Sequence, residues 1–100
     1  MDFRTAWIAL GRDPDDVIKI IKSCKTNDDR AKILMFDLVY AKKVAKALMR
    51  VYHPDMNDTY NEQLRKRYEL VSQSIKFIES ETDKAIKKLN KPKVLEIKIR

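Results

Sequence analysis

The sequence contains very little glycine, histidine or cysteine, and each shortage excludes a class of functional site. One glycine in 100 residues leaves no glycine-rich loop that could hold a nucleotide phosphate. One histidine and one cysteine are too few ligands for a zinc site, and no serine or cysteine stands beside the histidine as a nucleophile. The sequence therefore predicts no metal, no cofactor and no enzymatic activity.

The sequence also lacks the features of exported and membrane-spanning proteins. A single cysteine cannot form an internal disulfide, which is typical of a reducing compartment. No apolar run approaches the length of a membrane span, and the N-terminus has an acid at Asp2 and no apolar core like that of a signal peptide. We expect a soluble cytoplasmic monomer without a membrane partner, and both a cellular and a viral origin are compatible with it.

Two long stripes of apolar residues with helical spacing dominate the chain. Their members recur at intervals of three or four, which keeps each stripe on one face of a helix. Two such helices joined by a short loop bury their stripes by folding back as an antiparallel hairpin. The first stripe consists of Leu34, Leu38, Ala41, Ala45, Leu48 and Tyr52, and the second of Leu64, Tyr68, Val71, Ile75 and Ile78.

Proline and capping residues predict where these two helices begin and end. Thr26 and the acids after it open the first helix, and Pro54 ends it near Tyr52 because proline disfavours helical geometry in the residue before it. The polar residues 57–59 cap the second helix, which runs to about Asn90, before Pro92.

Two shorter helices are expected at the N-terminus. The first presents Phe3 and Trp7 to the core and stops at Gly11, and the second runs over residues 14–24 behind the acidic cap Asp13. We therefore predict an all-α domain over residues 1–90. The remaining residues 91–100 form a tail whose apolar alternation at Leu95, Ile97 and Ile99 predicts an extended segment.

The turn His53-Pro54-Asp55 between the two long helices has flanking segments that resemble a known family. Before it, residues 46–52 are basic, contain a leucine and end in a tyrosine; after it, residues 67–78 carry an aromatic and regularly spaced apolar residues. Near the N-terminus, Trp7-Ile8-Ala9-Leu10-Gly11 is similar to an aromatic-x-x-Leu-Gly helix. Over residues 5–79 the chain thus resembles the J domain of DnaJ-type co-chaperones.

This resemblance implies a binding function rather than a catalytic one. A J domain binds the ATP form of a heat-shock chaperone ATPase of the seventy-kilodalton class and stimulates its ATP hydrolysis. The resemblance implies that His53, Pro54 and Asp55, with Tyr52 before them, contact the partner. The exposed basic stripe of the first long helix would steer the domain onto an acidic patch of the ATPase, and it consists of Lys42, Lys43, Lys46 and Arg50.

The chain departs from the J-domain pattern between its first helix and the turn. It has 41 residues between Gly11 and His53, and the surplus accommodates the extra helix over residues 14–24. Two other functions remain open. The chain could be a J-like adaptor that has no coupling to a chaperone, or, since its net charge is +7, a basic helical protein that binds nucleic acid. The division of positive charge between both halves of the chain disfavours nucleic acid.

Overall fold

The computed structural model describes residues 1–53 and 62–90, and every regular element in these two ranges is an α-helix. This confirms the predicted all-α class. None of these helices is both long enough and apolar enough to cross a membrane. The four helices are α1 (Phe3–Ala9), α2 (Pro14–Ser23), α3 (Asn27–Tyr52) and α4 (Glu62–Leu89).

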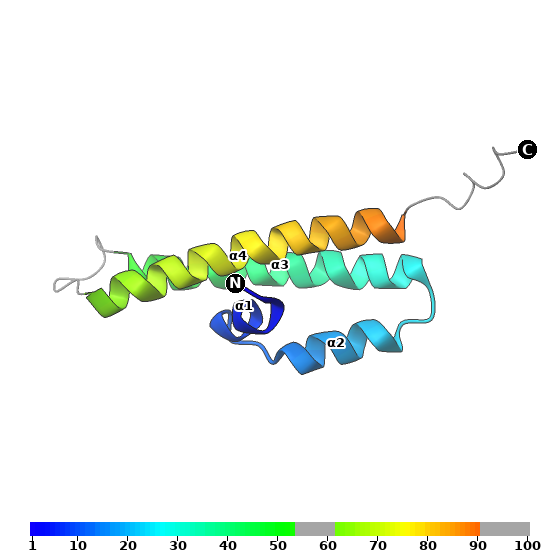
Figure 1. The fold of residues 1–100 in the computed structure, drawn as a ribbon, viewed down its shortest axis with the longest axis horizontal. Helices are drawn as coiled ribbons and strands as arrows, with labels where there is room; N and C mark the ends of the chain where they lie inside the picture. Colours follow the sequence, from blue (N-terminus) through cyan, green and yellow to red (C-terminus); the bar gives the residue numbers. More distant parts are fainter. Residues whose placement is uncertain (54–61, 91–100) are drawn as a thin grey trace, which may run out of the picture.

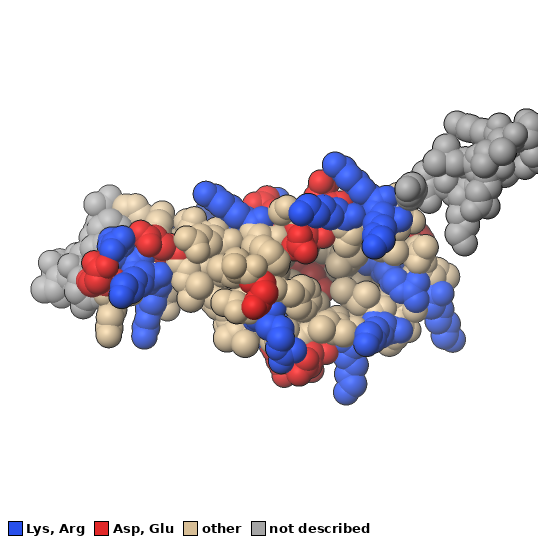
Figure 2. Space-filling view, viewed as in Figure 1, with Lys and Arg blue, Asp and Glu red and all other residues tan. Residues whose placement is uncertain are grey.

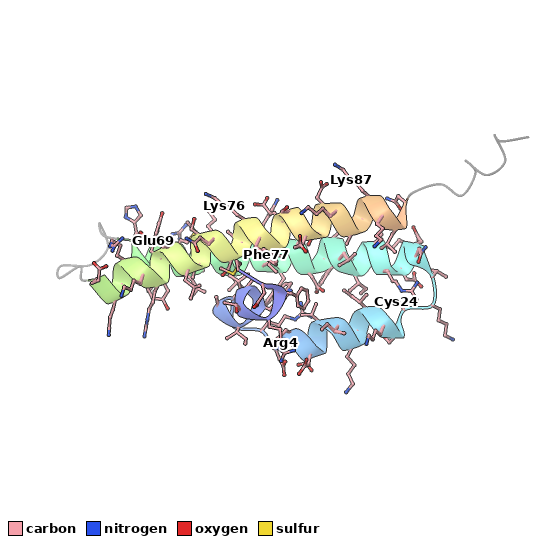
Figure 3. The ribbon with its side chains drawn as sticks, in the orientation of Figure 1. Arg4, Cys24, Glu69, Lys76, Phe77 and Lys87 are labelled. Carbon is pink, nitrogen blue, oxygen red and sulfur yellow. The ribbon has the colours of Figure 1, made fainter. Side chains whose placement is uncertain are left out.

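The long helices α3 and α4 lie side by side, run in opposite directions and form most of the molecule (Figure 1). Their facing stripes supply the centre of the core, where Ala41 and Ala45 of α3 meet Val71 and Ile78 of α4. The two alanines leave room for the helices to approach, while the larger residues of α4 fill the space between them. On the outer side of α4, exposed residues such as Lys76 and Lys87 point away from the core (Figure 3).

The beginnings of three helices are fixed by side-chain caps. Asp2, Asp13 and Thr26 each accept a hydrogen bond from a backbone N–H in the first turn of the helix that follows, at 2.7, 2.9 and 3.0 Å. These bonds satisfy donors that have no partner within the helix. The caps predicted at Asp13 and Thr26 are confirmed.

The end of α3 also lies where proline predicts it. Tyr52 is the last helical residue, and His53 has an extended backbone with φ −64° and ψ 139°. This geometry avoids the clash between the Pro54 ring and a helical residue before it. At its C-terminus, α4 ends at Leu89, one residue before the predicted Asn90.

The short helix α1 crosses the pair formed by α3 and α4 and packs chiefly on α4 (Figure 1). It buries Ala6 and Trp7, and Leu10 directly after it is equally buried, so the predicted role of Trp7 in the core is confirmed. Gly11 then adopts φ 78°, a left-handed conformation that glycine reaches without steric cost. The chain can therefore turn sharply from α1 into α2.

Helix α2 packs against α1 and α3 through the buried Val17. An exposed ion pair between Arg4 Nη1 and Asp15 Oδ1, at 2.7 Å, joins α1 to α2. At the far end, Arg30 of α3 donates to the backbone oxygen of Cys24 at 2.8 Å. The expected cap at residues 57–59 and the extended segment within residues 91–100 lie outside the described residues.

Candidate functional site

His53 lies directly after the last turn of α3 and contacts α4. Its imidazole stands edge-on to the ring of Tyr68, with 5.7 Å between the ring centroids and 76° between the ring planes. Edge-to-face contacts of this kind are favourable because the positive edge of one ring meets the negative face of the other. The half-buried His53 ring is thus oriented by α4. Pro54 and Asp55, the other residues of the predicted turn, lie outside the described residues.

Tyr52 makes a second contact between the same two helices. The guanidinium carbon of Arg67 lies 6.0 Å from the centre of the Tyr52 ring, within the range of a cation–π interaction. Two neighbouring residues at the end of α3 therefore each meet a residue in the first two turns of α4. Tyr52 is half-buried, so its ring serves the packing of α3 on α4 and also borders the surface.

The four basic residues predicted on α3 are all exposed, but they differ in their surroundings. Lys42 forms an ion pair with Glu79 of α4, with 3.3 Å between Nζ and Oε2. Lys43, Lys46 and Arg50 have no ion-pair partner among residues 1–53 and 62–90. Three cations that no described residue pairs with therefore follow the last turns of α3 towards His53, while the charge of Lys42 is partly neutralised.

The ion pair between Arg12 and Asp37 was not predicted from the sequence. Arg12 follows Gly11 and donates from Nη1 to Asp37 Oδ1 at 2.6 Å, and its guanidinium lies against the rings of Trp7 and Tyr40. Only 7% of the Asp37 side chain is exposed. The sequence held a signal, because Asp37 stands three residues after Leu34 and four before Ala41, within the apolar stripe of α3.

The described residues offer no constellation for metal binding. Within residues 1–53 and 62–90, no three side chains of His, Cys, Asp or Glu come together in a group that could hold a metal ion. The side chains that this surface presents near the end of α3 are the half-buried His53 ring and the exposed cations Lys43, Lys46 and Arg50.

No protein-family model, curated protein sequence or solved structure matches this chain.

Proposed function

We propose that this chain is a J-domain-type co-chaperone that binds the ATP form of a heat-shock chaperone ATPase of the seventy-kilodalton class and stimulates its ATP hydrolysis. The observation that supports this proposal best is the position of His53. It caps the end of α3 beside the cations Lys46 and Arg50 on the last two turns of the same helix. One rigid element thus combines a polar recognition group with the charge that would bring it to the partner.

The cations of α3 would act first, during the encounter. Exposed charges of one sign attract an acidic partner over distances of about a Debye length, roughly 8 Å at physiological salt. Lys43, Lys46 and Arg50 carry charge that no described residue neutralises. They would raise the association rate with an acidic patch of the ATPase more than they would lengthen the life of the complex.

The His53 ring would act in the bound state. Its packing against Tyr68 holds the ring in one orientation before the partner arrives. A preoriented group loses less conformational entropy on binding than a mobile one. Following the J-domain resemblance, His53 with Pro54 and Asp55 would contact the linker between the domains of the ATPase.

This domain would stimulate the ATPase without supplying a catalytic group. A binder shifts an equilibrium between two conformations when it binds one of them more tightly than the other. Preferential binding to the conformation that hydrolyses ATP would raise the population of that conformation. The partner's own residues would then perform the hydrolysis.

Ion pairs within α4 neutralise three of its seven cations, which reduces the positive charge that this helix offers to nucleic acid. On α4, Arg65 is paired with Glu62 and Glu69, Lys84 with Glu81, and Lys87 with Asp83. Acidic and basic side chains also lie intermixed on the face that Figure 2 shows. A binder of nucleic acid needs cations that are free to replace counterions along the phosphates.

A single-turnover ATPase assay with the chaperone of the source organism tests the proposal. We expect the chain to accelerate hydrolysis of ATP already bound to the chaperone, and to lose the effect as salt rises. A folded chain that binds the chaperone without accelerating hydrolysis would favour the J-like adaptor. Tighter binding of duplex or single-stranded nucleic acid than of the chaperone, at matched physiological salt, would contradict the proposal.

A further inference from the structure

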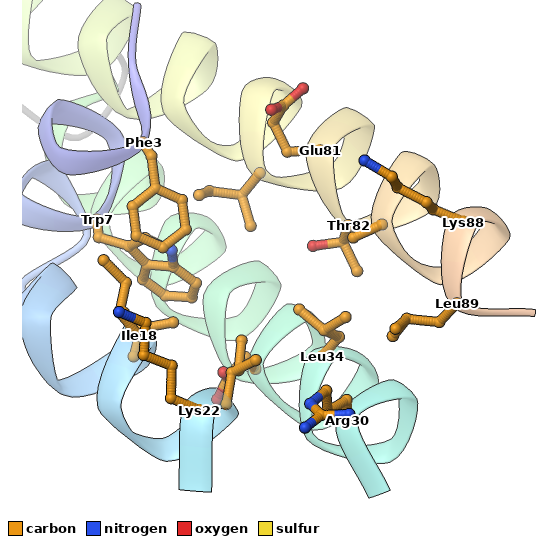
Figure 4. A pocket seen from close by; sticks show the side chains of 15 residues that line it. Phe3, Trp7, Ile18, Lys22, Arg30, Leu34, Glu81, Thr82, Lys88 and Leu89 are labelled. Atoms are coloured by element: carbon orange, nitrogen blue, oxygen red, sulfur yellow. The ribbon is translucent and has the colours of Figure 1, made fainter. Parts of the chain in front are cut away.

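A cavity of about 440 Å³ lies where α2 stands apart from α4 (Figure 4). Figure 2 shows a hollow on this face, between α2 and α4. The lining is mostly apolar and comes from all four helices. It includes Trp7 of α1, Val17 and Ile21 of α2, Leu34 of α3, and Ile78 and Ala85 of α4.

Two polar residues of this lining are buried, the neutral Thr82 and the charged Asp37. Asp37 Oδ1 accepts the hydrogen bond from Arg12, but its Oδ2 is buried and has no hydrogen-bond partner among the described residues. An acceptor of this kind is costly, because burial removes water without supplying a donor. The cavity therefore has a largely apolar wall and one buried acceptor that lacks a donor among the described residues.

This combination fits a small-molecule site. Ligand cavities in proteins have volumes of about 300–1,000 Å³ and apolar walls with a few polar groups that fix orientation. The charge of Asp37 is already balanced by Arg12, so the missing donor can be neutral. We propose that the cavity binds an apolar small molecule that carries one N–H or O–H group, and that this group donates to Asp37 Oδ2.

The proposal is independent of the co-chaperone function. The cavity lies beside the extra helix α2 and the first half of α3, whereas His53 lies at the other end of α3. Binding at the cavity can therefore be measured without a chaperone.

Indole and N-methylindole form a matched pair of probes, because only indole carries a donor. Titration of each into the 100-residue chain would be followed by NMR through the indole N–H of Trp7, which is the sole tryptophan of this sequence and lines the cavity. We expect saturable shifts with indole and at least about tenfold weaker binding of N-methylindole, since a hydrogen bond to a charged group contributes about that factor. Equal affinity for the two probes would overturn the role of Asp37.

Two substitutions in the cavity provide further tests. Asp37→Asn keeps an oxygen for Arg12 and replaces the free acceptor with a donor, so the preference for indole should disappear while N-methylindole binds as before. Ala85→Leu fills the cavity with a good helix former and should abolish binding of indole. Ala47→Leu, at an exposed position of α3 that does not line the cavity, is the control and should bind indole like the wild type.

Two outcomes would overturn the proposal altogether. The first is the absence of any shift of the Trp7 signal at millimolar indole. The second is that indole binds only when the apolar residues within residues 91–100 are replaced, for example in an Ile97→Asp, Ile99→Asp variant. That result would identify the occupant as the protein's own tail rather than a small molecule.

Discussion

Tyr68 of α4 meets His53 edge-on, with 5.7 Å between the ring centroids, so the orientation of the imidazole depends on the packing of α4 against α3. This contact joins the fold to the proposed function. His53, which would contact a partner, is held in place by Tyr68, which belongs to the contact between α3 and α4.

We predict that His53→Gln abolishes stimulation of the chaperone ATPase while the protein stays folded. Glutamine keeps the polarity and approximate size of histidine but lacks its ring, so it can neither pack edge-on against Tyr68 nor place two nitrogens in the same geometry. Because His53 is only half-buried, the melting temperature should fall by a few degrees at most. Single-turnover ATPase rates and thermal melts followed by circular dichroism measure the two effects.

Variants at Tyr68 separate the orientation of His53 from its presence. Tyr68→Phe keeps the ring and should retain stimulation, whereas Tyr68→Ala should weaken stimulation although His53 is still there. The loss from Tyr68→Ala should exceed that explained by its lower stability at the assay temperature. Full stimulation by a folded His53→Gln variant would contradict the proposed function.

The second prediction concerns the cations of α3. Reversing Lys46 and Arg50 to Glu should slow association with the chaperone and flatten its salt dependence, with little effect on dissociation. Lys19→Glu with Lys25→Glu makes the same change of net charge on and just after α2, away from the end of α3, and is the matched control. Stopped-flow measurements over a range of salt concentrations distinguish the two pairs, and equal slowing by both would indicate a net-charge effect.

A third prediction concerns the core between α3 and α4. Val71→Ala should destabilise the protein by about 1–3 kcal/mol, because Val71 is only 3% exposed and its removal leaves a cavity. Val39→Ala removes the same atoms from a position that is 50% exposed on α3. It should be neutral or slightly stabilising, since alanine is the better helix former. Chemical denaturation of both variants checks the difference, and equal costs would place Val71 outside the core.

The buried ion pair supplies a fourth prediction. Arg12→Ala should cost about 2–4 kcal/mol, because it leaves the Asp37 charge buried without a partner. We expect this loss of stability to be slightly smaller than that from breaking a fully buried ion pair, because the Arg12 side chain is 20% exposed. Replacing both partners by apolar residues, Arg12→Met with Asp37→Leu, should cost less than Arg12→Ala alone. Arg4→Ala, which breaks the exposed pair with Asp15, should change the melting temperature much less.

The same exposed pair predicts a dependence of stability on pH. The hydrogen bond from Arg4 lowers the pKa of Asp15 below its ordinary value of 3.8. The pair therefore contributes fully above pH 3.8, and its contribution is lost as the pH falls through the lowered pKa of the folded state. The difference in stability between the wild type and Asp15→Asn should be constant near neutral pH and shrink in this acidic range.

Asp16→Asn is the control for that experiment. It removes an equal charge from the first turn of α2 without touching the Arg4 contact. Urea denaturation at a series of pH values measures both variants. If Asp16→Asn reproduces the pH profile of Asp15→Asn, the effect comes from the helix dipole and not from Arg4.

Local features of the sequence were sufficient to predict the four helices and most of their ends. Spaced apolar residues produce amphipathic helices, and a cap or a proline acts within a few residues of its own position. Thr26 and Pro54 therefore define where α3 begins and ends, whichever way the helix packs against the others. The same patterns identified which faces of α3 and α4 are buried, because Ala41, Ala45, Val71 and Ile78 lie on the predicted stripes.

Only the tertiary structure decided what these helices bring together. The contact between His53 and Tyr68, the ion pair of Lys42 with Glu79, and the pairing of Arg12 with Asp37 each join residues from different parts of the chain. So does the cavity, which exists because α2 packs on α1 and α3 and stands apart from α4. Helical periodicity assigns a residue to a face, but distances between faces depend on how whole helices pack. For this reason the sequence predicted His53 as a recognition residue, and only the fold revealed Asp37 as a buried acceptor.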